Sequence, residues 1–60
     1  MNMLGNTIST QRKKLGLTQE QLAQRLDVTN QAVSKWETDQ SCPDVAMLRR
    51  LAELFQISLD

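Results

Sequence analysis

Few side chains in this 60-residue sequence could support catalysis or bind a metal ion. The sequence contains one cysteine, Cys42, and no histidine. A disulfide framework needs a second thiol, and a structural zinc site needs several Cys or His ligands, so neither is expected. Enzyme active sites place a nucleophile beside a base in a pocket, and a domain this small has little room for one. We therefore predict no enzyme activity, no metal and no cofactor.

The remaining candidates are four hydrogen-bonding or charged side chains within one short segment. They are Asn30, Gln31, Ser34 and Lys35. Val33 and Trp36 lie in the same segment, three residues apart, and on a helix this spacing turns both toward the core. The four polar side chains then occupy the other faces. This pattern alone fits either a solvated surface or a binding surface.

Local signals place this segment in the second of two short helices. Thr18 and Gln21 form a capping box, and the helix they open should end near Asp27, where a left-handed backbone is expected. Thr29 caps the next helix, over about residues 30–37.

Small and branched residues support a close crossing of these two helices. Ala23 is small where the helices would meet, and Val33 would fill the angle between them. Two short capped helices joined by about three residues match the geometry of a helix-turn-helix, here over residues 18–37.

A further helix is expected before this motif. It should run from about Met3 to Leu15, with Leu4, Ile8 and Leu15 on one face. Gly16 then supplies the left-handed residue that commonly ends a helix.

Two more helices are expected after the motif. Asp44 should cap a fourth helix, whose apolar residues recur at helical spacing: Leu48, Leu51, Ala52 and Phe55. Ile57 and Ser58 have the pattern of a fifth helix, cut short at Asp60. We therefore predict an all-α fold, a compact bundle of about five short helices, as one domain over residues 1–60 of a longer protein. Neither a signal peptide nor a membrane span is expected.

Charge is distributed unevenly although the net charge is zero. Up to Lys35 there are five basic and two acidic residues, a balance of +3, and the rest of the sequence balances at −3. The basic residues of the first part are Arg12, Lys13, Lys14, Arg25 and Lys35. A neutral total argues mildly against a nucleic-acid partner, but a molecule with one positive side remains able to bind DNA.

Two runs of residues make the motif specific. Residues 16–23 (GLTQEQLA) and 28–37 (VTNQAVSKWE) resemble the lambda repressor-like family (Cro/CI-type, XRE-type) of helix-turn-helix DNA-binding domains. The similarity continues through Pro43 to the end of the sequence. Asp27 stands where the family often has Gly, and Gln11 where it often has a buried Leu. The resemblance implies that the helix over about residues 30–37 lies in the major groove.

The resemblance also implies roles for individual side chains. Asn30, Gln31 and Lys35 are the expected base contacts, since an amide can pair bidentately with adenine and lysine can reach guanine or a phosphate. The expected phosphate contacts are Arg12, Gln19, Thr29 and Ser34. Arg12 is also expected to form a structural ion pair with Glu37, which would hold the arginine in place before DNA arrives.

Other conspicuous side chains are given structural or solvent roles. Trp36 should be core because it shares a face with Val33, and Cys42 should be an unreactive loop thiol. Arg49 and Arg50 flank the buried stripe of the fourth helix and are expected to be solvated.

The resemblance implies a function as well as a fold. It implies sequence-specific binding of double-stranded DNA by a transcriptional regulator, most often a repressor, in a bacterial or phage cytoplasm. Its full-length form would be a homodimer on a pseudo-palindromic operator. An antitoxin-type module that also binds a protein partner would share the motif, and the sequence does not separate these alternatives. Neither a membrane nor a metal is expected as a partner.

Overall fold

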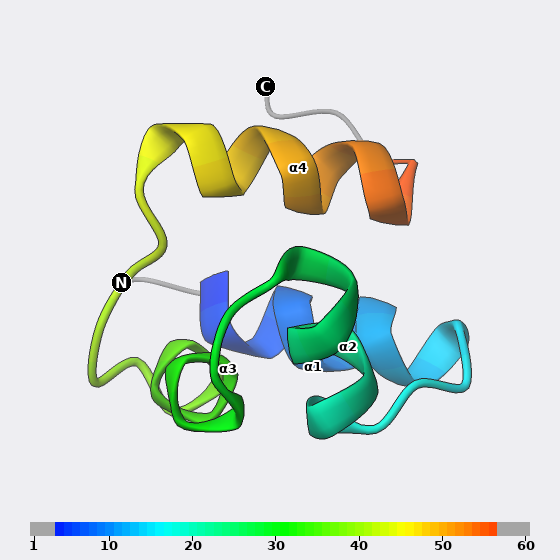
Figure 1. Ribbon diagram of the computed structural model, residues 1–60, viewed down its shortest axis with the longest axis horizontal. Coiled ribbons are helices and arrows are strands. Elements are labelled where there is room, and N and C mark those ends of the chain that lie inside the picture. Colours follow the sequence, from blue (N-terminus) through cyan, green and yellow to red (C-terminus); the bar gives the residue numbers. More distant parts are fainter. Residues whose placement is uncertain (1–3, 57–60) are drawn as a thin grey trace.

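The computed structural model describes residues 4–56, most of which lie in four α-helices (Figure 1). These are α1 (Leu4–Lys14), α2 (Gln19–Leu26), α3 (Asn30–Glu37) and α4 (Val45–Phe55), and the described residues contain no strand. In Figure 1, α1 and α4 run across the view one above the other, and α3 is seen nearly end-on. The all-α prediction is confirmed. The predicted fifth helix begins at residues 57 and 58, outside the described range.

Three helices begin at the capping residues that the sequence indicates. The Thr18 hydroxyl accepts a hydrogen bond from the Gln21 backbone N–H at 3.0 Å, and the Gln21 side chain accepts one from the Thr18 N–H at 2.9 Å, which completes the capping box. Thr29 and Asp44 each accept from the backbone N–H three residues further on, at 3.1 and 2.8 Å. These bonds satisfy backbone donors that have no partner within the helix.

Each of the four described helices is followed by a residue with left-handed backbone angles. Gly16, with φ of 72°, and Asp27, with φ of 59°, confirm the positions expected from the sequence. Asp39 and Gln56 have the same conformation, with φ of 62° and 58°, although neither is glycine and neither was expected. The left-handed residue turns the chain so that its N–H can reach carbonyls of the last helical turn.

The end of the first helix differs from the prediction. α1 ends at Lys14, and Leu15 is 47% exposed instead of joining Leu4 and Ile8 in the core. Leu15 lies in the turn that Gly16 completes, so its side chain has left the helical face on which the spacing had placed it.

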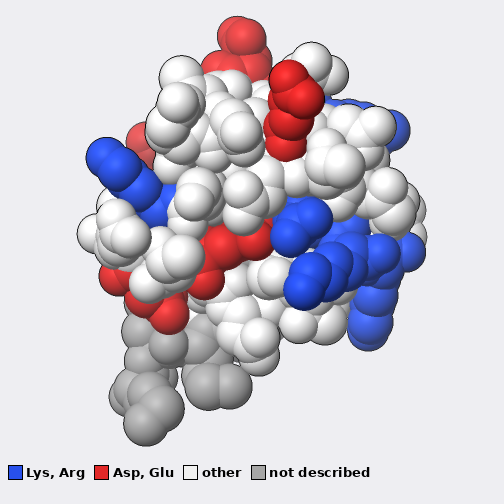
Figure 2. All heavy atoms as spheres, turned by 90° about the horizontal axis from the view of Figure 1, so that it is seen from below, with Lys and Arg blue, Asp and Glu red and all other residues white. Residues whose placement is uncertain are grey.

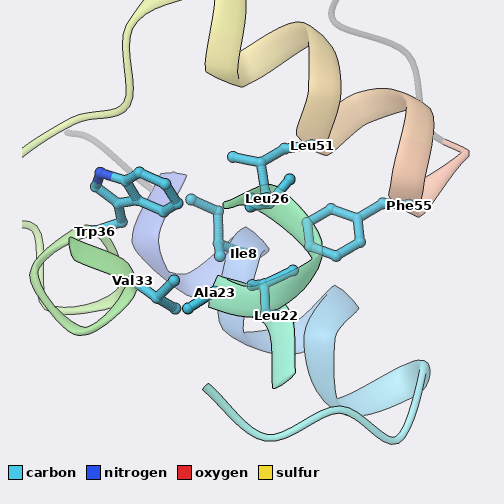
Figure 3. Close-up of a cluster of buried hydrophobic side chains, with 8 residues drawn as sticks. All are labelled: Ile8, Leu22, Ala23, Leu26, Val33, Trp36, Leu51 and Phe55. Atoms are coloured by element: carbon cyan, nitrogen blue, oxygen red, sulfur yellow. The ribbon is translucent and has the colours of Figure 1, made fainter. Parts of the chain in front are cut away.

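All four helices contribute to one core (Figure 3). Its buried members are Ile8 from α1, Leu22, Ala23 and Leu26 from α2, Val33 and Trp36 from α3, and Leu51 and Phe55 from α4. Ala23 and Val33 lie side by side at 2% and 0% exposure, which confirms that a small residue lets α2 and α3 cross closely. Trp36 is part of this core, as its spacing from Val33 predicts.

Candidate nucleic-acid interface

The first turn of α3 presents polar side chains to solvent. Asn30 and Gln31 are exposed there, and Lys35 is exposed one turn later. Within the described residues, no hydrogen bond or ion pair occupies these three side chains. The opposite face of α3 is buried through Val33 and Trp36. The helix is therefore anchored along one side and leaves two amides and one ammonium group available for a ligand.

Two hydroxyl groups flank this exposed surface. The Thr29 oxygen already accepts the Ala32 N–H at 3.1 Å as the cap of α3, so its own O–H proton remains free to donate to an anion. Ser34 is half-buried, and its backbone carbonyl accepts a hydrogen bond from the Thr38 hydroxyl at 3.0 Å.

The last turn of α3 is held by a cluster that we call the Glu37 cluster, made of Arg12, Gln19 and Glu37. Arg12 Nε donates to Glu37 Oε2 at 2.7 Å, and Arg12 Nη2 donates to Oε1 at 3.2 Å, so the ion pair is bidentate. Gln19 Nε2 donates to the same Oε1 at 3.1 Å. Arg12 Nη1 donates to the Leu17 carbonyl at 2.8 Å. The cluster thus joins the end of α1, the start of α2 and the end of α3.

Burial makes the Glu37 cluster structurally important. The Arg12 and Glu37 side chains are only 12% and 7% exposed. An ion pair removed from water in this way is costly to break, because a single remaining charge has lost both its partner and its solvation. Gln19, which was predicted as a phosphate contact, donates one amide N–H to Glu37 in this cluster. Any phosphate contact by Gln19 must use its second amide N–H or its backbone N–H.

The start of α1 makes a second contact with the end of α3, which sequence reasoning missed. Gly5 N donates to the Asp39 carboxylate at 3.2 Å. A Cβ atom added at Gly5 would lie 2.6 Å from the Trp36 carbonyl oxygen and 2.8 Å from that of Glu37, so only glycine fits between the two backbones without displacement. The positive start of α1 thereby faces the negative end of α3, a favourable arrangement of helix dipoles.

Arg50 is the second functional candidate that sequence reasoning missed. Arg50 is exposed, as expected, but its guanidinium also donates to the Leu26 carbonyl at 3.0 Å and to the Arg25 carbonyl at 3.5 Å, two contacts that the sequence did not indicate. Its neighbour Arg49 is exposed too, as expected. Two adjacent arginines look alike in sequence, and only the packing of α4 beside α2 distinguishes them.

Basic side chains are not spread evenly over the surface. Figure 2 shows the face at the bottom of Figure 1, with Lys and Arg atoms gathered on its right, the side where α1 ends. Lys13 and Lys14 are exposed at that end of α1. Asp and Glu atoms lie mainly to the left of this group or above it. The molecule therefore has a positively charged side despite its zero net charge.

The described part of the chain has few features of other kinds of site. Residues 4–56 contain no group of three or more His, Cys, Asp or Glu side chains placed to hold a metal ion. None of the helices described there is both long and apolar enough to span a membrane. Cys42 is exposed in the connection between α3 and α4.

The chain is similar to several proteins that are named as HTH-type transcriptional regulators or activators. The chain is 41% identical over 44 residues to the HTH-type transcriptional activator BcrR of Enterococcus faecalis, covering 73% of this chain and 22% of that protein. It is 35% identical over 57 residues to the HTH-type transcriptional regulator ImmR of Bacillus subtilis, covering 95% of this chain and 45% of ImmR. An uncharacterized HTH-type transcriptional regulator of Methanothermobacter thermautotrophicus is 42% identical over 45 residues, 75% of this chain and 65% of that protein. The chain thus spans less than half the length of BcrR and of ImmR.

No solved structure matches the chain. The family model described as helix-turn-helix matches residues 8–60, which include α2, the turn and α3. By this match, and by the geometry of α2 and α3, the chain belongs to the lambda repressor-like (XRE-type) helix-turn-helix family.

Proposed function

We propose that this domain binds double-stranded DNA sequence-specifically, with α3 in the major groove, as the N-terminal part of a longer transcriptional regulator. The observation that carries the proposal is the exposed first turn of α3, whose side chains have no partner among residues 4–56, on a helix whose other face is buried. A major groove admits one α-helix, and the groove edges of the bases carry the donors and acceptors that amide and ammonium groups recognise.

The base contacts assigned to this surface are Asn30, Gln31 and Lys35. Each amide can donate to N7 and accept from N6 of adenine in a bidentate pair, and the Lys35 ammonium can reach guanine or a phosphate. Asn30 and Gln31 are adjacent at the exposed start of α3, so they would enter the groove together.

The phosphate contacts assigned here surround that surface. Thr29 has a free hydroxyl proton beside the start of α3, and Ser34 lies one turn further along the helix. Arg12 has engaged its three guanidinium nitrogens within the protein, but it retains N–H groups beyond those bonds. Gln19 begins α2, where unpaired backbone N–H groups and the helix dipole favour an anion. Ordered contacts of this kind would fix the register of α3 on the duplex.

We propose repression as the action, because a domain that covers its site on DNA can block transcription without any further contact. Activation would require an additional surface for the transcription machinery. The full-length protein is proposed to act in the cytoplasm as a homodimer on a pseudo-palindromic operator, with half-sites about 34 Å apart on one DNA face. Expression of a reporter placed behind the operator should fall when the full-length protein is present, and a rise would overturn repression.

The test of DNA binding is selection of sites from random duplex DNA by the full-length protein. Recovery of a pseudo-palindrome with half-sites one helical turn apart would support both binding and dimer geometry. Affinity for the selected site should then fall with salt by a log–log slope of about −0.9 per phosphate neutralised. Recovery of no enriched sequence, or an affinity insensitive to salt, would overturn the proposal. Co-purification of a toxin-like protein would instead favour the antitoxin-type alternative.

A further inference from the structure

The C-terminus of α2 is the point at which the helix-turn-helix changes direction. The last four carbonyls of a helix have no partner inside it and must be satisfied from elsewhere. Two of the four in α2 are satisfied locally, since Val28 N donates to the Ala23 carbonyl at 3.0 Å and Asp27 N donates to the Gln24 carbonyl at 3.3 Å. These two bonds form a Schellman motif around the left-handed Asp27.

The other two carbonyls, of Arg25 and Leu26, are satisfied by Arg50 of α4. Arg50 is an exposed residue, and its Nη1 lies 3.0 Å from the Leu26 oxygen in a partly buried contact. Its Nη2 lies 3.5 Å from the Arg25 oxygen in an exposed contact. One planar guanidinium therefore caps both remaining acceptors. Its positive charge also lies at the negative end of the α2 dipole, where a cation is favoured.

The corresponding end of α1 has the same backbone motif without such a side-chain cap. α1 also ends in a Schellman motif, with Leu17 N donating to the Arg12 carbonyl at 3.1 Å and Gly16 N to the Lys13 carbonyl at 3.0 Å. No side chain among residues 4–56 donates to the next two carbonyls there, those of residues 14 and 15. Of these two helix ends, only that of α2 has a side-chain donor to these carbonyls within residues 4–56, and it lies at the turn that leads into α3.

We propose that Arg50 is a positioning residue for α3. By holding the last two carbonyls of α2, it fixes the turn at Asp27 and so the angle at which α3 leaves it. Arg50 acts through α2 and the turn and makes no contact with DNA. Its effect on DNA binding rests on the proposed function, whereas its effect on the turn is independent of that function.

The effect on the turn is measured in the free protein by amide hydrogen exchange. Arg50→Met removes both donors and keeps the aliphatic stem, Arg50→Lys restores one charged donor, and Arg49→Met is the matched control on the same helix turn. We expect Asp27 and Val28 amides to exchange about tenfold faster in Arg50→Met, beyond any change shared by the amides of α1. Arg50→Lys should recover part of this protection, and Arg49→Met should leave it unchanged.

An exchange rate that rises equally throughout the molecule, or equally in both methionine variants, would overturn the cap. Should Arg50→Met fail to fold, Arg50→Lys carries the same test, because the loss of one of two donors should still raise exchange selectively at Asp27 and Val28.

The effect on binding is measured with the selected duplex at several salt concentrations. Arg50→Met should weaken binding about five- to tenfold with the same salt slope as the unmodified protein, because no phosphate contact is lost. A slope shallower by about 0.9, the loss expected for one phosphate contact, would show that Arg50 touches DNA and would overturn the positioning role. If the unmodified protein binds no duplex, the proposed function fails, and the exchange experiment still decides whether the cap exists.

Discussion

At its first turn α3 presents Asn30 and Gln31 to solvent, whereas at its last turn Glu37 is 7% exposed and accepts three hydrogen bonds from two other helices. The same eight-residue helix thus has one free end and one fixed end. A helix this short is not stable alone, so its orientation must come from its neighbours. We therefore expect the two ends to have different roles. The fixed end sets the direction of α3, and the free end is available to bind the proposed DNA ligand. Four substitutions test this difference, in order of their expected effect on the free energy of unfolding.

The largest effect is expected at the fixed end, from Glu37→Ala. This change leaves the Arg12 guanidinium, 12% exposed, without its carboxylate and removes the acceptor of Gln19. Breaking a buried pair in this way should cost about 3 kcal/mol, a large share of the stability of a small domain. Urea unfolding followed by the fluorescence of Trp36 measures the loss.

The matched control for Glu37→Ala is Glu53→Ala, which removes an exposed carboxylate from α4 and should change stability by less than about 0.5 kcal/mol. The double variant Arg12→Met with Glu37→Leu should be more stable than Glu37→Ala alone, because no single charge stays buried. Equal stability of the Glu37→Ala and Glu53→Ala variants would show that the Glu37 cluster does not hold α3.

A smaller loss is expected where α1 meets the same end of α3. Gly5→Ala would place a methyl group 2.6 Å from the Trp36 carbonyl oxygen, so the two helices must move apart. The strain should outweigh the better helix propensity of alanine and leave a net loss of about 2 kcal/mol. Asn6→Ala, at the next and exposed position of α1, should not destabilise the protein. Thermal unfolding of both variants makes the comparison, and equal melting temperatures would refute the close approach.

A gain is expected at the turn that leads to the free end. Asp27 has a left-handed backbone that glycine adopts without strain, so Asp27→Gly should stabilise the domain by about 0.5 kcal/mol after the entropy of glycine is counted. Asp39 has nearly the same φ, but its carboxylate accepts the Gly5 N–H at 3.2 Å. Asp39→Gly should therefore lose that bond and bring no gain. Urea midpoints that rise equally for both variants would contradict a structural role for the Asp39 side chain.

The smallest effect on stability is expected at the free end. Gln31→Ala removes an exposed side chain with no partner among the described residues, so the free energy of unfolding should change by less than about 0.5 kcal/mol. Binding to the selected duplex should nevertheless weaken by about 1–3 kcal/mol, with a relaxed preference at one base pair. Gln24→Ala, an exposed glutamine of α2, should alter neither quantity. Unchanged operator preference in Gln31→Ala would remove this residue from the binding surface.

Local signals in the sequence determined where the helices of the motif begin and how α2 ends. Thr18, Thr29 and Asp44 each bond to a backbone N–H three residues away, so residue type and spacing within one turn are sufficient to identify these caps. The apolar spacing likewise placed Val33 and Trp36 in the core. Leu15 shows the limit of spacing, because a helix that stops one residue earlier turns the side chain out of the core.

Only the tertiary structure decided which polar side chains are free and which are occupied. Gly5 with Asp39, Arg50 with Leu26, and Gln19 with Glu37 are separated by 34, 24 and 18 residues along the chain. Whether such groups meet depends on how whole helices pack. The residue type alone does not show whether an arginine or glutamine side chain is solvated or hydrogen-bonded to a distant residue. The sequence alone thus indicated the cap residues of the helices and the helix expected to lie in the major groove. The packing of α1 and α2 against α3 decided how that helix is held, because long-range hydrogen bonds follow from the arrangement of the core.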